Sequence, residues 1–192
     1  ARQVLPARPR LKPALRRLWR DPTTLQLGVD PEAAVVIAGL DGRRSRLVDL
    51  LDGSTDVHGL RAAGEKLGLT GDEVDDLLRL LVRSGVVEDA AVGAGWARRL
   101  DLADRDRLAP DLAAASLAHP QRGGPAVLGD RQRAVVALHG AGRVGAPLGM
   151  LLAAAGVGTL VVEDAGAVRP ADLAPGGLQA EHLGLRRQEA AA

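Results

Sequence analysis

A glycine-rich turn between two apolar runs constrains the fold of this chain more than any other feature. Gly140, Gly142 and Gly145 form a G-x-G-x-x-G pattern directly after the apolar run 134–138. A helical segment follows, and a second apolar run then ends in the acidic pair at 163–164. In such a unit the glycines permit a tight turn, let a phosphate approach the backbone, and let helix and strand pack closely. This order of elements predicts a β-α-β nucleotide site, either present or ancestral. The alternative is a tight strand-to-helix turn that binds no ligand, which we consider less favoured.

The composition excludes several other classes of protein. The net charge of +1 gives no general attraction to nucleic acid or anionic lipid, and the absence of Phe and Tyr rules out stacking platforms for single-stranded nucleic acid. Without cysteine there is no disulfide or thiolate nucleophile, and the histidines have no ligand spacing, so we predict no metal site from side chains. The uncharged run 144–162 is interrupted by Gly and Pro, which argues against a membrane span. We expect a cytoplasmic protein with no nucleic-acid partner.

The N-terminal half is predicted to contain an α+β winged helix. Residues 1–20 form a basic arm, which we expect to be a solvated lead-in to a domain at 21–90. Apolar alternation predicts a strand at 25–29 and a hairpin partner at 33–37. Helices are expected at about 41–51, from 55 or 56 to 67, and at 72–83, the last opened by the capping box Thr70-Gly-Asp-Glu73. Val86-Val87 is expected to return as a strand beside the hairpin.

The C-terminal half is predicted to be incomplete. Residues 91–130 are expected to be a connector, with a partly helical stretch at 100–117. From 131 to 192 we expect two strands and one crossover helix, the start of a Rossmann-like α/β fold. A doubly wound sheet needs several more strands to bury its faces, so we expect the chain to be a piece of a longer protein.

Residues 131–192 resemble the start of the ThiF/MoeB-type adenylyltransferases, relatives of the ubiquitin-activating enzymes. The resemblance rests on the glycine loop 140–145, on the run 155–164, and on Val168, Asp172-Leu173 and Gly184. Members usually show an apolar strand ending in Asp, then D-x-V-x-x-S-N-L-x-R-Q, then G-x-x-K. In that family the loop and the first Asp hold ATP, used with Mg²⁺, the Arg and Lys contact its phosphates, and a carboxyl terminus is adenylated. Relatives often dimerise through this domain, which implies a homodimer.

The resemblance also implies site residues and a defect. The implied cofactor-binding positions are Gly140, Gly142, Gly145, Asp164 and Arg187, with Asp164 at the ribose-binding Asp and Arg187 at the family Lys. Asp172 stands where Asn is expected, and Pro175 stands at the Arg position. Proline cannot replace the planar, multidentate phosphate clamp of an arginine. We therefore expect impaired or absent adenylation, and whether the chain is an enzyme stays open.

Residues 25–88 resemble the PqqD-like winged-helix domains known as RiPP recognition elements, chiefly in the stretch 47–53 before Asp56-Val57. Fused ahead of a ThiF-like domain, such a unit implies a leader-peptide-binding protein of thiazole/oxazole-modified peptide biosynthesis. Its implied partners are a precursor leader peptide and a separate YcaO-type cyclodehydratase. In that family the leader adds as a strand to the hairpin edge beside the third helix. The implied peptide-binding residues are Ala34, Val35, Val36, Ile37, Leu78 and Val82. In the alternative, the rest of the protein covers this edge.

Three further functions stay open. One is an active ATP-dependent adenylyltransferase for a ubiquitin-like modifier, sulfur carrier or peptide carboxylate, against which Pro175 argues. Another is an NAD(P)-dependent oxidoreductase, since the glycine fingerprint serves both nucleotides, although Asp172-Leu173 favours the adenylyltransferase family. The third is a DNA-binding regulator, but the acidic start of the helix at 72–83 would be repelled by phosphate.

Overall fold

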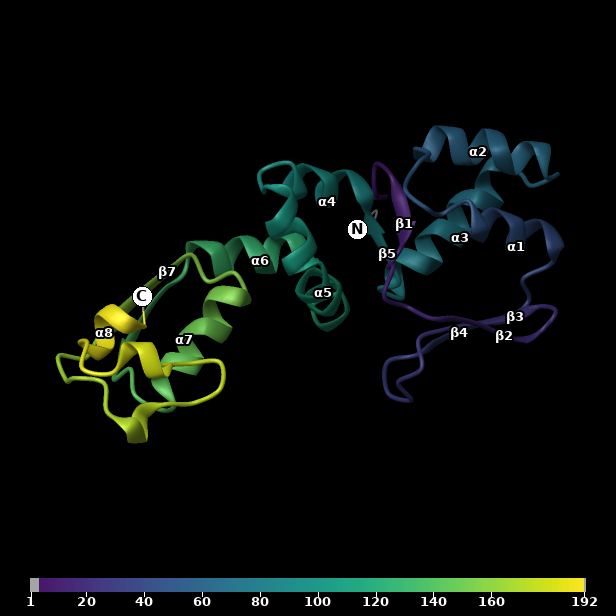
Figure 1. Cartoon of the computed structure of the whole chain (residues 1–192). Helices are drawn as coiled ribbons and strands as arrows, with labels where there is room; N and C mark the ends of the chain where they lie inside the picture. The colour runs from purple at the N-terminus through teal and green to yellow at the C-terminus, as the bar shows by residue number, and fades with distance from the viewer. Residues whose placement is uncertain (1–3, 192) are drawn as a thin grey trace. The chain divides into compact units, whose positions relative to one another are not determined.

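The computed structural model describes residues 4–191, which fall into two compact units (Figure 1). Of the described residues, 4–101 and 112–125 form the N-terminal unit, and 102–111 and 126–191 form the C-terminal unit. Residues 1–3 of the expected basic arm and residue 192 lie outside the described residues.

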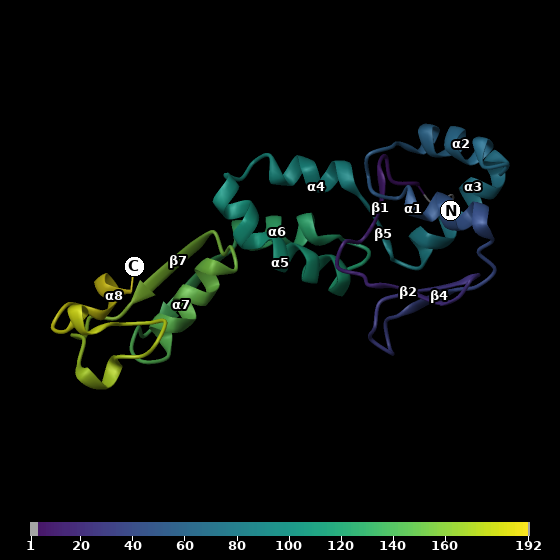
Figure 2. The ribbon, with the colours of Figure 1, turned by 45° about the vertical axis from the view of Figure 1, so that its right-hand side comes forward.

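A three-stranded antiparallel sheet of order β2-β3-β4 contains the expected hairpin. Its strands are β2 (Arg17–Asp21), β3 (Thr24–Leu27) and β4 (Val35–Ile37). In the register Leu25 lies opposite Ile37, and Gln26 lies opposite Val36. Leu25 and Leu27 are buried while Gln26 is not, which is the period-two burial that the alternation predicts. The hairpin prediction is confirmed, and β4 forms one free edge of the sheet (Figure 2).

The basic arm is more than a lead-in, because it supplies two strands, although β2 is exposed to solvent along its whole length. Part of it is β2, and β1 (Pro9–Leu11) pairs antiparallel with β5 (Val87–Asp89). The prediction that Val86-Val87 returns beside the hairpin is therefore wrong. The physical reason is electrostatic, since Arg10 lies opposite Glu88 and the two form an ion pair at 2.6 Å. The Asp89 carboxylate also accepts the backbone N–H groups of residues 7 and 8.

The expected helices are present as α1 (Gly42–Asp49), α2 (Val57–Lys66) and α3 (Gly71–Arg83). Asp41, Asp56 and Thr70 cap their N-termini with side-chain oxygens. The predicted capping box is confirmed, because the Thr70 hydroxyl accepts from the Glu73 N–H and the Glu73 carboxylate accepts from the Thr70 N–H.

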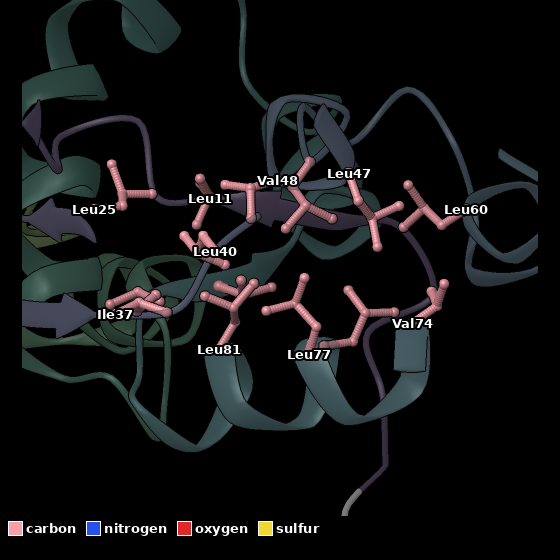
Figure 3. Close-up of a cluster of buried hydrophobic side chains, with 14 of the residues drawn as sticks. Leu11, Leu25, Ile37, Leu40, Leu47, Val48, Leu60, Val74, Leu77 and Leu81 are labelled. Atoms are coloured by element: carbon pink, nitrogen blue, oxygen red, sulfur yellow. The ribbon is translucent and has the colours of Figure 1, made fainter. Parts of the chain in front are cut away.

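The three helices and the two small sheets share one apolar core. Val74, Leu77 and Leu81 line one side of α3 and point toward side chains of α1 and α2, and Ile37 of β4 lies beside Leu81 (Figure 3). Leu77 and Leu81 are one helical turn apart, so the stripe follows from the i, i+3, i+4 spacing in the sequence. This core holds the hairpin and α3 together.

The expected connector is more helical than the sequence indicates. It forms α4 (Ala90–Ala97), α5 (Leu102–Ala118) and α6 (Gly124–Arg133). The helix α5 continues through Pro110, although proline usually ends a helix. No helix within residues 4–191 is long and apolar enough to cross a membrane.

The C-terminal unit contains a parallel pair of strands, β6 (Val135–His139) and β7 (Thr159–Glu163), connected through α7 (Gly145–Ala154). The chain then forms two short 3-10 turns, η1 (Pro170–Asp172) and η2 (Ala180–His182), and the short helix α8 (Arg187–Ala190). A small core of Ala146, Val168 and Leu178 joins α7 to this C-terminal segment. The strand-helix-strand prediction is confirmed at the level of these elements.

Candidate functional site

The glycine loop joins β6 to α7 in a backbone conformation that only glycine tolerates well. Gly140 has a φ of 102°, in the left-handed region, and its N–H donates to the carbonyl of Glu163 at 3.0 Å. A Cβ on Gly145 would overlap the carbonyl oxygen of Gly140. The first and last glycines are therefore required by the turn itself, whether or not a ligand binds.

Asp164 follows β7 directly and fastens the glycine loop. Its Oδ2 accepts the N–H of Ala141 and its Oδ1 accepts the N–H of Gly166, both at 2.9 Å. These backbone donors, and then the nearby Arg187, hold the pKa of the Asp164 carboxyl below its usual value. The carboxylate expected to bind a ribose is thus engaged by the protein itself.

Arg187, the first residue of α8, bridges two carboxylates. Its Nε lies 3.0 Å from Asp164 Oδ2 as an ion pair without hydrogen-bond geometry, and its Nη1 donates to Asp172 Oδ2 at 3.1 Å. The contact with Asp164, above all, raises the pKa of the guanidinium. A Cβ on Gly166 would overlap Arg187 Nη2, so glycine at 166 leaves the space that the guanidinium fills. The cation expected to reach a phosphate is instead enclosed within the fold.

Asp172 places a negative charge against the glycine loop. It lies in η1, where its Oδ2 accepts the N–H of Arg169 at 2.9 Å, and this bond first, then Arg187, lowers the pKa of its carboxyl. Its Oδ1 lies 3.2 Å from the point where a Cβ on Gly142 would stand. A carboxylate therefore faces the glycine that was expected to let a phosphate approach.

These residues do not fit the phosphates of ATP. Two carboxylates share one guanidinium, so the cluster of Asp164, Asp172 and Arg187 has an excess negative charge. Pro175 is exposed and offers no donor in place of the family arginine. Among residues 4–191, no three His, Cys, Asp or Glu side chains lie together as a metal site. The glycine loop forms a tight strand-to-helix turn, whereas the charges around it oppose a polyphosphate.

Two residues of this cluster had no place in the sequence analysis. Gly166 makes room for Arg187, and Gln188 accepts the N–H of Asp164 through its Oε1 at 3.3 Å. The sequence signal for Gly166 was its position two residues after the acidic pair 163–164. A glycine is needed there because the chain turns around the Asp164 carboxylate. Nothing in the spacing indicated Gln188. His139 ends β6 and lies 2.8 Å from Glu163 in an exposed pair.

The second candidate site is the free edge of β4. The Gly28 N–H donates to the Arg16 carbonyl, so the backbone N–H and C=O of Gln26, two residues earlier, also point toward β2. The backbone groups of Leu25 and Leu27 therefore point the other way, toward β4. Their partners Val35 and Ile37 then use their backbone groups inside the sheet. By this alternation the N–H and C=O of Val36 point away from the sheet, and the Val36 side chain is 45% exposed. The edge presents one donor and one acceptor to an added strand.

The other expected peptide-binding residues differ in whether their side chains are exposed to a ligand. Ala34 directly precedes β4, and Val82 of α3 is half-buried. Leu78 is only 1% exposed and belongs to the core, so its side chain cannot contact a ligand in this structure. Leu80, which the sequence analysis did not single out, is 41% exposed on α3. Leu80 stands in an apolar run of the sequence, so its position away from the buried side of α3 was not evident from the sequence.

Comparison with solved structures shows a mixed α/β fold similar to two others. The microcin C7 biosynthetic enzyme MccB in complex with N-formylated MccA has a TM-score of 0.63 and 14% identity, over 95% of this chain and 49% of that one. E. coli MccB with ATP gives 0.64 and 14% over 95% and 51%, and PaaA gives 0.69 and 20% over 92% and 53%. The chain spans about half the length of these structures. No protein-family model and no curated protein matches the sequence.

Proposed function

We propose that this chain is a leader-peptide-binding, ThiF-like protein of ribosomal peptide modification, of the thiazole/oxazole class, with a degenerate adenylation site. The observation that carries the proposal is the free, uncharged edge of β4 beside α3, where Val36 presents an unpaired N–H and C=O. An extended peptide binds such an edge through main-chain hydrogen bonds, and neighbouring apolar pockets select its side chains.

The two edges of the sheet differ in the way that the proposal requires. The β2 edge has charges at Arg17, Arg20 and Asp21, and its register shifts between Trp19 and Asp21. Charges and irregular register are the usual means of keeping an edge from pairing. The β4 edge has neither, because all three of its residues are Val or Ile. Strand addition is therefore expected at β4 and not at β2.

The similar structures support the same assignment. MccB was solved in complex with N-formylated MccA and with ATP. Its likeness to this chain extends over 95% of the residues, which includes both the winged-helix candidate and the glycine loop. By this analogy we propose a precursor leader as the ligand. From the resemblance of the sequence to the two families we propose a YcaO-type cyclodehydratase as the separate modifying partner and a homodimer as the assembly.

An active adenylyltransferase is the second candidate, favoured by the intact turn of Gly140 and Gly145 and by the ATP complex of MccB. The engaged Asp164 and Arg187 and the carboxylate of Asp172 argue against it. We expect ATP with Mg²⁺ to show no saturable binding below about 1 mM by calorimetry, the upper end of usual substrate KM values. Saturable micromolar binding together with ATP–pyrophosphate exchange would establish the second candidate.

The test of peptide binding begins with selection from a displayed library of random 12-residue peptides on the whole chain. Val36→Pro then removes the outward N–H of β4 without removing a sheet hydrogen bond. We expect about tenfold or greater loss of affinity, because a hydrogen bond is lost and its acceptor on the peptide is left unpaired. Measurement is by fluorescence anisotropy with a labelled selected peptide.

Two matched variants control this test. Val36→Thr keeps the N–H and should bind within a few-fold of the unsubstituted chain. By the same alternation Arg17 directs its N–H outward on the β2 edge, so Arg17→Pro removes the equivalent donor there and should leave affinity unchanged. Equal loss in both proline variants, or no selectable peptide at all, would sink the proposed function.

A further inference from the structure

Within the described residues the chain passes between the two units three times, and one passage lies inside a helix. The first follows residue 101, at the start of α5, and the third follows residue 125, in the first turn of α6. The second follows residue 111, in the interior of α5 and close to Pro110. The helix is therefore divided, since residues 102–111 belong to the C-terminal unit and residues 112–118 to the N-terminal unit.

The first part of α5 is fixed to the end of α7. Arg107 donates from its Nη1 to the carbonyl of Ala153, in the last turn of α7, at 2.8 Å. Leu108 is 1% exposed, and a Cβ on Gly156 would lie 2.9 Å from its Cδ2. The turn that contains residues 107 and 108 therefore belongs firmly to the C-terminal unit.

The last part of α5 is fixed to the β1–β5 pair. Ser116 is 3% exposed, and its Oγ donates to Oε2 of Glu88, in β5, at 2.7 Å. Lys12, which directly follows β1, is also buried and donates from Nζ to the Ser116 carbonyl at 2.6 Å. A cation is favourable at this carbonyl because the last turn of a helix has a partial negative charge. The end of α5 therefore belongs firmly to the N-terminal unit.

Pro110 lies between these two anchored parts and weakens the helix there. Proline has no N–H to donate to the carbonyl of Asp106, four residues earlier, and its ring crowds that carbonyl. Sharp bends of helices occur at proline for this reason. Pro110 is exposed, so packing around its ring does not compensate for the lost hydrogen bond. A bend of α5 is therefore expected at Pro110 and not within either anchored part.

The third passage lies beside the second. A Cβ on Gly124 would overlap the carbonyl oxygen of Leu112, so the start of α6 packs directly on the backbone of α5. Gly123 has a φ of 76°, in the left-handed region that favours glycine, and it stands before Gly124 and Pro125. Glycine thus permits backbone rotation next to the place where α5 is weakest.

An ion pair spans the bend. Asp111, the first residue after Pro110, accepts from Nη1 of Arg131 at 2.6 Å, and the same nitrogen donates to the carbonyl of Ala155 at 2.8 Å. Arg131 therefore keeps a partner in the C-terminal unit when Asp111 moves away. The two side chains are 30% and 36% exposed, and a partly exposed pair of this kind restrains a helix only weakly.

We propose that α5 is a hinge, which bends at Pro110 and is restrained in one position by the ion pair of Asp111 with Arg131. The two units then reorient as separate bodies, each carrying its own anchored part of α5. This inference goes beyond the proposed function and does not depend on it, because the bend operates with or without a bound peptide. A peptide held on β4 would be carried by the hinge together with the N-terminal unit.

The test measures distances between spin labels in the whole chain. The sequence has no cysteine, so Glu65→Cys on α2 and Met150→Cys on α7 place one label at an exposed position of each unit. The reference pair, Glu65→Cys with Val92→Cys on α4, lies within the N-terminal unit. A bend of about 20°, where proline kinks begin, moves a label about 20 Å from the bend by about 7 Å. By double electron–electron resonance, the distance distribution between the units should therefore be several ångströms broader than that of the reference pair.

Replacing the helix-interior proline should stiffen the hinge. Pro110→Ala restores the missing N–H with the best helix former at an exposed position, so the chain should fold and the distribution between the units should narrow toward that of the reference pair. Pro110→Gly should give an intermediate width, because glycine has the N–H but favours a helix less than alanine. Pro125→Ala is the control and should leave the width unchanged, because a proline in the first turn of a helix lacks only an N–H that has no partner within the helix.

Removing the restraint should act in the opposite direction. Asp111→Ala should broaden the distribution between the units, and added salt should broaden it for the unsubstituted chain more than for this variant. The matched control is Asp104→Ala on the same helix, whose ion pair with Arg107 stays on one side of Pro110 and whose loss should not change the width.

Three results would overturn the inference. One is a distribution between the units that is already as narrow as that of the reference pair in the unsubstituted chain. Another is an equally broad distribution in Pro110→Ala, since the motion would then arise outside α5. The third is equal narrowing by Pro125→Ala, which would assign the motion to the start of α6.

Discussion

The two units of this chain are stabilised in different ways. The N-terminal unit has a continuous apolar core, in which Leu27, Leu51, Leu60 and Leu81 are fully buried. The C-terminal unit buries Leu108 and Leu128 and the small cluster around Ala146, while outward residues of its sheet stay open, with Val135 68% exposed. The Arg187 ion pairs and the glycine turn add specific polar contacts to this unit. Burial of apolar side chains stabilises the N-terminal unit, whereas specific polar contacts contribute more to the stability of the C-terminal unit.

The helices α3 and α7 show the same difference. Most apolar residues of α3 lie on one buried face, with Asp72, Asp76 and the exposed Leu80 outside it. In α7 the residues are apolar all round, and Leu148 and Leu151 are exposed. A helix of the second kind, and parallel strands that are apolar on both faces, are typical of elements covered on every side. Apolarity alone therefore does not tell which residues a short α/β unit buries.

The largest expected effect sharpens this contrast in the N-terminal unit. Leu81→Ala removes a side chain with no exposure and should lower the free energy of unfolding of that unit by about 2–5 kcal/mol. Both tryptophans, Trp19 and Trp96, belong to this unit, so tryptophan fluorescence during urea unfolding reports it alone. Leu80→Ala, at a 41% exposed position, is the control and should cost less than half as much. Equal losses would contradict the assigned core.

A smaller effect is expected from the glycine turn of the C-terminal unit. Gly145→Ala introduces a Cβ that overlaps the Gly140 carbonyl, and overpacking of this kind costs about 1–3 kcal/mol. Hydrogen exchange of residues 134–164 should accelerate, while the tryptophan transition stays unchanged. Gly142→Ala is the matched control, because its Cβ would meet only the side-chain Oδ1 of Asp172, which can shift. If the tryptophan transition moved as well, the two units would not be independent.

The smallest effect concerns the Arg187 ion pairs. Backbone donors first, and then Arg187, hold the pKa values of Asp164 and Asp172 below about 3.9, the value for an unfolded Asp. Stabilisation from this source is complete above that value and is lost as the pH falls through the lowered folded-state pKa values. Arg187→Ala should therefore reduce the Tm of the C-terminal unit most at pH 7, and the difference from the unsubstituted chain should shrink toward pH 2.

The neighbouring arginine provides the control for this measurement. Arg186 is 65% exposed and reaches Glu189 only at 3.9 Å, so Arg186→Ala should leave the Tm unchanged at either pH. A constant Tm difference for Arg187→Ala across the pH range would mean that Arg187 acts through packing and not through the two carboxylates.

Local signals in the sequence predicted the first three helices, the hairpin and the strand-helix-strand order well, but not the helices α4 and α6 of the connector. The capping box at Thr70 and the alternation around Leu25 depend on residues close together in the chain. The pairing of β1 with β5 joins residues about eighty positions apart, and only the opposite charges of Arg10 and Glu88 indicated it. The Arg187 guanidinium fills the space that the missing side chain of Gly166 leaves. The spacing of residues within a motif does not reveal such a contact.

The space at Gly166 also restricts how this chain can change by mutation. Any side chain larger than hydrogen at 166 would displace the Arg187 guanidinium and leave Asp164 and Asp172 without their shared cation. The same substitution meets no such obstacle once Arg187 has been replaced by a smaller residue. The two positions are therefore epistatic, and a mutational route that opens this site to an anion is accessible only if residue 187 changes first.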